Sequence, residues 1–446
     1  MQITPAKEIK GSFLLPSSPD MLFVSICLSI SSSCRTQIEP VRTTPDILRW
    51  AGQFRNSAKV VFDASSCIVE PLQGNNQPPC FAYTDIPYRD FTVFLLLAHT
   101  KSIFVSDLPP KRLEQLQQCC LRVGCAIAAE QSDGMQKLVL EKADHFHIPD
   151  TIIDADDIHP FLGLAIGLRQ PVEFIADHAW SSPLKHALQY FGYTCTVKSL
   201  SQKKDEDPIM RRIRFMKTGK KSEGPQQFSV SLNFTKAPEE QVHIDLPGDE
   251  MLAGLIIAAK CLIPKGSFVL ENVGLESWNT QILQLVKSMG GAVGVQESRM
   301  SSFGSVGSVV IQKINPFGRK VDCRPRCQYV AQLPAMIVMA AFAQGQSIFR
   351  NLEDRRNDNP DGLEQLNLCI AALGARQGEM PDGIVIEGAK QFDGFDLSGQ
   401  FPADIAGAFA IAGLKCRGIT TIADESILNR WPDFTDILSS VCDFKE

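Results

Sequence analysis

The fold is indicated by the segment PADIAGAFAIAGLKCRG, residues 402–418, which runs into GITTIADES and then into WPDFTDILSSV. Apart from Asp404, its first dozen residues are small and apolar all round, which is typical of a helix buried on every side. The second segment is rich in β-branched residues, as strands are. The third has apolar residues at helical spacing on one face. The order buried helix, strand, outer helix therefore defines one structural unit.

The same order occurs twice more in the second half of the chain. LPAMIVMAAFAQG leads through GQSIFRNLE to DGLEQLNLCIAALGA, and DEMLAGLIIAAKCLIPKG leads through GSFVLENVG to NTQILQLVKSMGGAV. A glycine opens each strand segment, namely Gly266, Gly345 and Gly418. The unit thus recurs about every 75 residues, which is the signature of an internal repeat.

The first half carries three more divergent copies of the unit. Their buried helices are expected in DMLFVSICLSISSS, YRDFTVFLLLAHTKS and DIHPFLGLAIGLRQP. The amphipathic helices are expected to end at glycines that can adopt a left-handed conformation, namely Gly52, Gly124, Gly192, Gly290 and Gly374. Six units predict an α/β (α+β) protein of two domains, each with three units around central helices. A doubly wound α/β fold also alternates helices and strands, but the chain has no GxGxxG phosphate loop.

Composition narrows the class of protein. The 446 residues are 44% hydrophobic and 21% charged, with a formal net charge of −6, which indicates a packed globular protein with no overall basic surface for nucleic acid. The basic run within residues 203–221 is interpreted as one strand of a hairpin with a solvated basic face, with binding of an acidic partner as the alternative. The fourteen cysteines form no regular framework, so we expect reduced thiols and a cytoplasmic location.

The apolar run at residues 21–30, preceded by Lys7 and Lys10, has the look of a signal peptide. The repeat assigns it instead to a buried helix, and ten residues are too few to span a bilayer. We therefore expect no membrane partner.

The repeated units resemble those of the enolpyruvyl transferases, and most closely those of the EPSP (5-enolpyruvylshikimate-3-phosphate) synthases. In LPGDEMLAGLIIAAK, Pro247, Gly248 and Asp249 match that family's PGD-x-SSAAFF segment. WPDF at residues 431–434 resembles its FPDF/FPDY signature, which favours it over the UDP-N-acetylglucosamine enolpyruvyl transferase branch.

The resemblance implies a two-domain inside-out α/β barrel of enolpyruvyl transferase type, with three of the six units in each domain. The chain of such a protein crosses twice between the domains. One domain is then expected to comprise residues 1–15 plus 247–446 and the other residues 16–246, with crossings near residues 15–20 and 243–249.

The resemblance also implies an activity. The family transfers an enolpyruvyl group from phosphoenolpyruvate to shikimate 3-phosphate, in the shikimate pathway of aromatic amino acid biosynthesis. The partner would be a small anionic metabolite held by Lys and Arg between the domains, because two phosphates and two carboxylates need opposite charge. Carboxylate and lysine side chains would move the protons. We expect no cofactor, no metal, no nucleic acid and a monomer.

Matched position by position, however, the chain lacks most of the family's charged groups. Pro19 stands at a lysine, Val24 and Asp90 at arginines, and Thr84 and Asp85 in the phosphoenolpyruvate loop. His159 falls in the segment that holds the shikimate phosphate. The catalytic positions are occupied by Pro19, Ala335 for an aspartate, Asn359 for a glutamate, Asp404 for an arginine and Asn429 for a lysine.

A few basic and acidic residues remain as substrate-binding candidates. Arg112, Arg356 and Asp361 match family positions, and Arg89 and Arg430 lie directly beside replaced ones. Two functions stay open: an enzyme of the family that is weakly active or uses a less charged acceptor, and an inactive relative that binds a metabolite or a protein partner between the domains.

Two further patterns contain residue types that bind metal ions. His145 and His147 form an HxH that could begin a metal site, but two ligands are few and an exposed strand explains them better. Cys323 and Cys327 lack a second pair and are interpreted as ordinary thiols.

Overall fold

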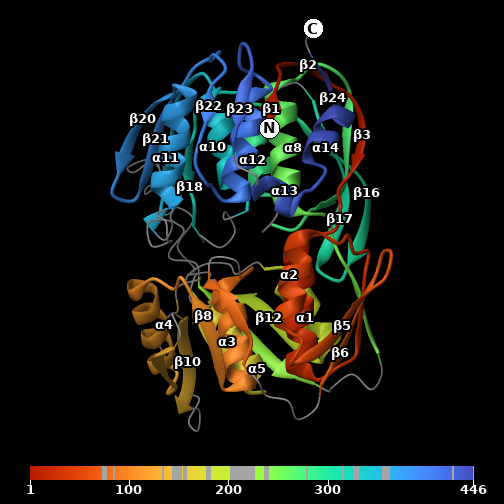
Figure 1. Cartoon of the computed structure of the whole chain (residues 1–446), viewed down its shortest axis with the longest axis vertical. Helices are drawn as coiled ribbons and strands as arrows, with labels where there is room; N and C mark the ends of the chain where they lie inside the picture. The colour runs from red at the N-terminus through yellow and green to blue at the C-terminus, as the bar shows by residue number, and fades with distance from the viewer. Residues whose placement is uncertain are drawn as a thin grey trace, which may run out of the picture.

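The computed structural model of the chain describes residues 1–72, 78–83, 86–132, 135–142, 153, 158–176, 182–200, 227–235, 241–277, 280–312, 316–324, 331–353, 362–423 and 426–444. Two lobes are stacked along the long axis, and both chain termini lie in the same lobe (Figure 1). We call the lobe with the termini the upper lobe and the other the lower lobe. Predictions for residues 143–147 and 203–221 lie outside the described residues.

The helices of the lower lobe are α1 (Pro19–Ser32), α2 (Pro45–Gln53), α3 (Arg89–Thr100), α4 (Pro110–Arg122), α5 (Ile158–Gly167), α6 (Leu184–Ala187) and the 3₁₀ helix η3 (Leu188–Phe191). Those of the upper lobe are α8 (Glu250–Leu262), α9 (Gln281–Ser288), α10 (Leu333–Ala341), α11 (Gly362–Leu373), α12 (Ala403–Gly413), α13 (Ser426–Arg430) and α14 (Phe434–Val441).

The strands of the lower lobe are β4 (Thr36–Glu39), β5 (Ala58–Phe62), β6 (Cys67–Pro71), β7 (Cys80–Ala82), β8 (Ser102–Ser106), β9 (Ala126–Ser132), β10 (Met135–Lys142), β11 (Val172–Ala176), β12 (Tyr193–Ser199), β13 (Phe228–Phe234) and β14 (Val242–Asp245). Those of the upper lobe are β1 (Gln2–Ile3), β2 (Ala6–Ile9), β3 (Gly11–Leu14), β15 (Phe268–Gly274), β16 (Val293–Ser301), β17 (Gly304–Ile311), β18 (Lys320–Asp322), β19 (Gly345–Arg350), β20 (Arg376–Met380), β21 (Gly383–Gly388), β22 (Asp396–Leu397), β23 (Thr420–Ile422) and β24 (Cys442–Phe444).

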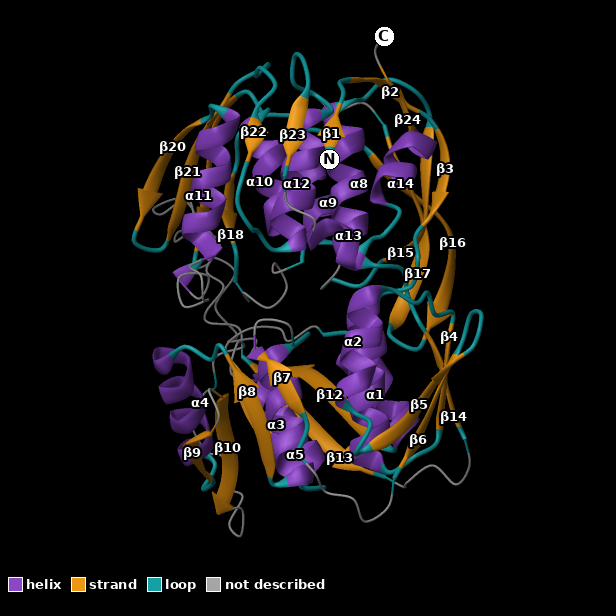
Figure 2. Ribbon diagram, viewed as in Figure 1, coloured by secondary structure: helices purple, strands orange, loops and turns teal. Residues whose placement is uncertain are grey.

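The six predicted buried helices are α1, α3, α5, α8, α10 and α12. They lie inside their lobes, with sheets and outer helices around them (Figure 2). In α12 every residue from Asp404 to Gly413 is buried, whereas the outer helix α2 buries only Ile47 and Trp50. The predicted two-lobed α/β fold of repeated units is thereby confirmed, since a helix that is apolar all round is stable only when enclosed.

The sheets follow the same repeat. The lower lobe has the strand orders β14-β4-β6-β5, β7-β8-β10-β9 and β11-β13-β12, and the upper lobe has β16-β17-β15-β3, β18-β19-β21-β20 and β1-β23-β22, besides the pair β2-β24. Among the described strands these sheets are small and separate rather than one continuous parallel sheet. The doubly wound alternative is therefore wrong.

Each lobe has its own hydrophobic core. The upper core joins residues between Ile3 and Leu15 to residues from Leu252 to Cys442. The lower core contains residues from Met21 to Leu246 and one residue of the upper lobe, Phe303. We keep the division into residues 1–15 plus 247–446 and 16–246 as a proposal, which these two cores support.

The chain passes between the lobes at two adjacent segments. Ser17 and Gly248 form an antiparallel bridge, flanked by hydrogen bonds from Ser18 N–H to Pro247 O (2.9 Å) and from Asp249 N–H to Pro16 O (2.8 Å). A Cβ atom on Gly248 would lie 2.3 Å from the carbonyl oxygen of Asn272, so only glycine fits here. The buried helices α1 and α8 thus begin side by side, one in each lobe, at a place that we call the joint.

The predicted glycine caps are confirmed at four of five positions. Gly124, Gly192, Gly290 and Gly374 have φ between 76° and 90°. The prediction for Gly52 is wrong, because α2 continues through it to Gln53 and is capped by Phe54, whose N–H bonds to Ala51 O. That turn closes α2 without a left-handed residue.

Residues 21–30 lie within α1, as the repeat predicted. Over the described ranges, every helix is too short or too polar to cross a membrane.

Candidate functional site

The joint contains a buried acidic residue that organises α8. Asp249 caps this helix, because its carboxylate accepts hydrogen bonds from the N–H groups of Met251 (2.9 Å) and Leu252 (3.2 Å). It also accepts one from the indole N–H of Trp431 at 2.9 Å. The side chain is almost completely buried, and this burial raises the pKa of Asp249 above its usual value.

Arg430 is the cation of the joint. It ends α13 and is only 8% exposed. Its Nη1 donates to Asp20 Oδ1 at 3.0 Å, its Nη2 lies 3.7 Å from Asp249 Oδ1, and its guanidinium is 5.5 Å from the centre of the Trp431 ring. Two carboxylates of the chain itself therefore already neutralise this arginine.

A third carboxyl group, that of Glu250, completes the cluster. Its Oε2 accepts a hydrogen bond from the hydroxyl of Ser18 at 2.9 Å across the joint. Burial, reinforced by the neighbouring charges of Asp20 and Asp249, raises the pKa of Glu250 to about 8. At neutral pH this carboxyl group is therefore mostly protonated. We call Asp20, Asp249, Glu250 and Arg430 the joint cluster.

A second polar cluster lies in the lower lobe around Arg112, the third residue of α4. Its Nε donates to the hydroxyl of Tyr83 at 2.9 Å, and its Nη2 is bonded to the carboxylate of Asp90. Tyr83 in turn donates to Asp90 Oδ1 at 3.2 Å, and the guanidinium of Arg89 lies 5.5 Å from the centre of the Tyr83 ring. Asp90, predicted to stand at an arginine position, is thus the partner of Arg112, which is predicted to match one.

His159 contributes no positive charge near this cluster. It is buried, and its Nε2 lies 3.2 Å from the hydroxyl oxygen of Ser182. Burial lowers the pKa of His159 to about 4, against a smaller opposing effect of Asp90. The imidazole is therefore neutral in the native protein at pH 7.

The other predicted catalytic positions are uncharged or acidic where the structure describes them. Pro19 is the buried first residue of α1 and Ala335 the buried third residue of α10. Asp404 is 6% exposed, and its carboxylate accepts the N–H of Ile405 at 2.9 Å. Asn429 is exposed on α13.

Several predicted residues lie outside the described ranges, namely Asn359, Arg356 and Asp361, together with Thr84 and Asp85. The substrate-binding role of Arg112, Arg430 and Arg89 stays a prediction. The structure brings Arg112 and Arg89 together around Tyr83 and places Arg430 in the joint.

The sequence did not indicate Asp20, Glu250 or Trp431 as neighbours of Arg430. One signal could have pointed to Glu250: two adjacent acidic residues, Asp249 and Glu250, directly precede a run that is apolar all round. Asp249 caps α8, and Glu250, the first residue of that helix, is buried with it. No sequence pattern pairs Asp20 with Arg430.

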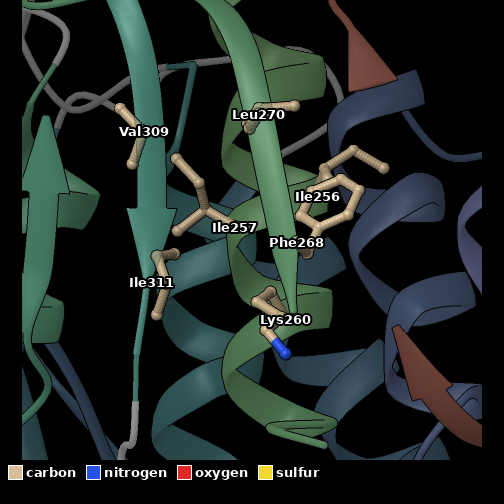
Figure 3. Close-up of a pocket in the computed structure, with 7 residues that line it drawn as sticks. All are labelled: Ile256, Ile257, Lys260, Phe268, Leu270, Val309 and Ile311. Atoms are coloured by element: carbon tan, nitrogen blue, oxygen red, sulfur yellow. The ribbon is translucent and has the colours of Figure 1, made fainter. Parts of the chain in front are cut away.

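A small pocket lies apart from both clusters. It is enclosed by α8, β15 and β17 and lined by Ile256, Ile257, Lys260, Phe268, Leu270, Val309 and Ile311 (Figure 3). Its lining is apolar except for Lys260, which lies in the last turn of α8 whereas Glu250 begins that helix. Among the described residues, no three His, Cys, Asp or Glu side chains are placed to hold a metal ion.

Comparison with known sequences identifies similar proteins. Residues 221–438 match the family described as EPSP synthase (3-phosphoshikimate 1-carboxyvinyltransferase). The 3-phosphoshikimate 1-carboxyvinyltransferase of Desulforudis audaxviator is 29% identical over 211 residues, which are 46% of this chain and 49% of that protein. The enzyme of the same name from Brevibacillus brevis is 30% identical over 201 residues, 44% of this chain and 47% of that protein. The chain thus spans about half the length of these relatives in the alignments.

Comparison with solved structures extends over the whole chain. EPSP synthase from Acinetobacter baumannii superposes with a TM-score of 0.66 at 18% identity, covering 99% of this chain and 98% of that one. The enolpyruvyl transferase NikO from Streptomyces tendae gives a TM-score of 0.67 at 15% identity, with coverage of 100% and 98%. At these identities the likeness establishes the fold alone.

Proposed function

The chain belongs to the family of EPSP synthases and related enolpyruvyl transferases, and from this premise we propose that it is a relative that does not carry out the standard transfer. It acts instead as a binding protein with the same two-lobed fold. Its ligand carries less negative charge than phosphoenolpyruvate and shikimate 3-phosphate carry together. The predicted cytoplasmic location and monomeric state belong to this proposal.

The observation that carries the proposal is that Arg112 and Arg430 are each paired with a carboxylate of the same chain. Each is a candidate for holding a substrate anion, and each is bonded to an aspartate of the same chain, Arg112 to Asp90 and Arg430 to Asp20. An anion would have to displace a carboxylate that is already in place. At an effective dielectric constant of 20, one close unit-charge pair contributes about 4 kcal/mol, so the loss of such pairs lowers affinity by orders of magnitude.

The catalytic positions support the same conclusion. The described part of the chain offers Pro19, Ala335 and Asn429 where the family has two lysines and an aspartate, and these side chains cannot move protons. Asp404 adds negative charge where the family has an arginine.

A second function is favoured by the partial exposure of Arg112. Its side chain is 22% exposed, so a ligand carboxylate could compete with Asp90. The chain would then be an enolpyruvyl transferase that uses phosphoenolpyruvate with a less charged acceptor.

Phosphate release with phosphoenolpyruvate and shikimate 3-phosphate tests the proposal, with the EPSP synthase of Acinetobacter baumannii as the positive control. We expect no release above background and no thermal shift by either compound at millimolar concentration. Turnover that is abolished in the Arg112→Ala variant would establish the enzyme instead. A thermal shift with phosphoenolpyruvate alone, also lost in that variant, would favour the second function.

A further inference from the structure

The joint cluster places three carboxyl groups and one guanidinium in the interior, where the two lobes meet. Asp20 belongs to α1 of the lower lobe, whereas Asp249, Glu250 and Arg430 belong to the upper lobe. Asp249 and Glu250 are 1% and 4% exposed. With all three carboxyl groups ionised, the cluster has a net charge of −2 and only one cation to balance it.

The hydrogen bonds show which carboxyl groups are balanced. Asp20 is paired with Arg430, and Asp249 receives two backbone N–H groups, the indole N–H of Trp431 and the nearby charge of Arg430. Glu250 has only the neutral hydroxyl of Ser18 and its own backbone N–H as hydrogen-bond donors among the described residues. A buried carboxylate with so little compensation is strongly disfavoured.

The charged groups that interact with Glu250 belong to the joint cluster. Its neighbours from α1 are Ser18 and Asp20, and its neighbour from α13 is Arg430. From the start of α10 comes the neutral Gln332, whose amide lies 3.5 Å from the backbone carbonyl of Glu250.

We propose that the carboxyl group of Glu250 is a proton-operated switch of the joint: protonated, it lets α1 and α8 begin side by side, and ionised, it repels Asp20 of the lower lobe so that the lobes separate. Separation hydrates Glu250 and breaks the bond to Ser18. The two chain crossings at Ser17 and Gly248 keep the lobes tethered and serve as the hinge. This inference does not depend on transferase activity, since it concerns contacts within the chain.

The direction of the pH effect follows from linkage. Burial and like charge raise the pKa of Glu250 from 4.5 to about 8. Its contribution to the closed, folded state is therefore complete below pH 4.5 and is lost as the pH rises toward 8. Between pH 6.5 and 7.5 the closed state retains close to one proton more than the open or unfolded state, so the equilibrium constant of opening rises about tenfold.

The test compares Glu250→Gln with the unaltered protein and with Glu364→Gln. Glutamine is the neutral mimic of protonated Glu250, and Glu364 is an exposed glutamate in the first turn of α11. In denaturant titrations at pH 6.5 and 7.5, we expect the unfolding constant to rise about tenfold for the unaltered protein and Glu364→Gln. We expect no comparable rise for Glu250→Gln.

Small-angle X-ray scattering provides the second measurement and needs no variant. The radius of gyration of the unaltered protein is expected to be larger at pH 8.5 than at pH 6.5, and that of Glu250→Gln to stay at the smaller value. An unchanged radius in the unaltered protein would overturn the switch. So would a Glu250→Gln variant whose unfolding constant still follows pH like that of Glu364→Gln.

Discussion

The carboxylate of Asp20 and the guanidinium of Arg430 are 3.0 Å apart across the joint, although 410 residues separate them in the sequence. Their side chains are only 14% and 9% exposed. Arg430, a predicted substrate-binding residue, thus connects one lobe to the other. The same arrangement recurs at Arg112 and Asp90, within the lower lobe.

Arg430→Ala is expected to destabilise the protein by about 3–5 kcal/mol, because it leaves the buried carboxylate of Asp249 and the largely buried carboxylate of Asp20 without a cation. The control is Arg42→Ala, which breaks the half-exposed pair of Arg42 with Asp433 (2.6 Å) between the same lobes. That change should lower stability by at most about 1 kcal/mol. Denaturant titration measures both, and equal losses would contradict the buried role of Arg430.

Asp90→Asn is expected to release Arg112 for a ligand. With the competing carboxylate removed, phosphoenolpyruvate at millimolar concentration should raise the melting temperature by on the order of 2 °C. Asp46→Asn, which breaks the exposed pair with Arg49, should show no such shift. Neither variant should turn over, because Pro19 and Ala335 remain. If Asp90→Asn gains no thermal shift, the charge of Asp90 is not what excludes the anion.

His159 should make the protein acid-sensitive. Its pKa is about 4 in the folded state and 6.5 in the unfolded state, so the unfolded chain binds the extra proton. Stability is full above pH 6.5 and falls as the pH drops toward 4, by on the order of 3 kcal/mol over the whole range. The slope is opposite in sign to that of Glu250.

The measurement is the free energy of unfolding at pH 4.5, 5.5 and 6.5 in the unaltered protein and in His159→Gln. The variant should lose the part of the slope that His159 contributes. As a control, His243→Gln changes an exposed histidine on β14 and should leave the slope as it was. Parallel pH curves for all three proteins would show that His159 is not buried as described.

Lys260→Met is expected to destabilise the upper lobe. The Nζ of Lys260 donates to the carbonyl oxygens of Pro264 (2.9 Å), Lys265 (3.1 Å) and Gly266 (2.7 Å), which follow the end of α8. The Lys265 carbonyl also accepts the N–H of Ile9 (3.1 Å), whereas each of the other two carbonyls, which belong to exposed residues, loses a part-buried hydrogen bond that contributes about 0.5–1.5 kcal/mol. Figure 3 shows Lys260 beside the apolar pocket, where a methionine side chain fits the surroundings but not the carbonyls.

The matched control for this change is Lys265→Met, because the Lys265 side chain is 65% exposed and only five residues away. It should alter the unfolding free energy by less than about 0.5 kcal/mol. A loss of similar size in both variants would mean that the carbonyl contacts of Lys260 contribute little.

The repeat, the buried helices and the resemblance to the enolpyruvyl transferases could be predicted from the sequence alone. A helix that is apolar on all sides has to be enclosed, and a strand and an amphipathic helix recurring about every 75 residues have to pack in the same way each time. These are local properties, so PADIAGAFAIAGLKCRG and its copies indicate them even when the segments that pack against them are unknown. The predicted cap at Gly52 is wrong because the turn at Phe54, and not the glycine, ends α2.

The state of the candidate site was decided by the tertiary structure. Whether Arg112 or Arg430 is available to an anion depends on which side chain lies opposite, and Asp90 and Asp20 reach those places only when the chain folds. Likewise, the raised pKa of Glu250 and the lowered pKa of His159 result from burial by distant segments. Charge compensation acts through space over a few ångströms, so sequence order cannot specify it.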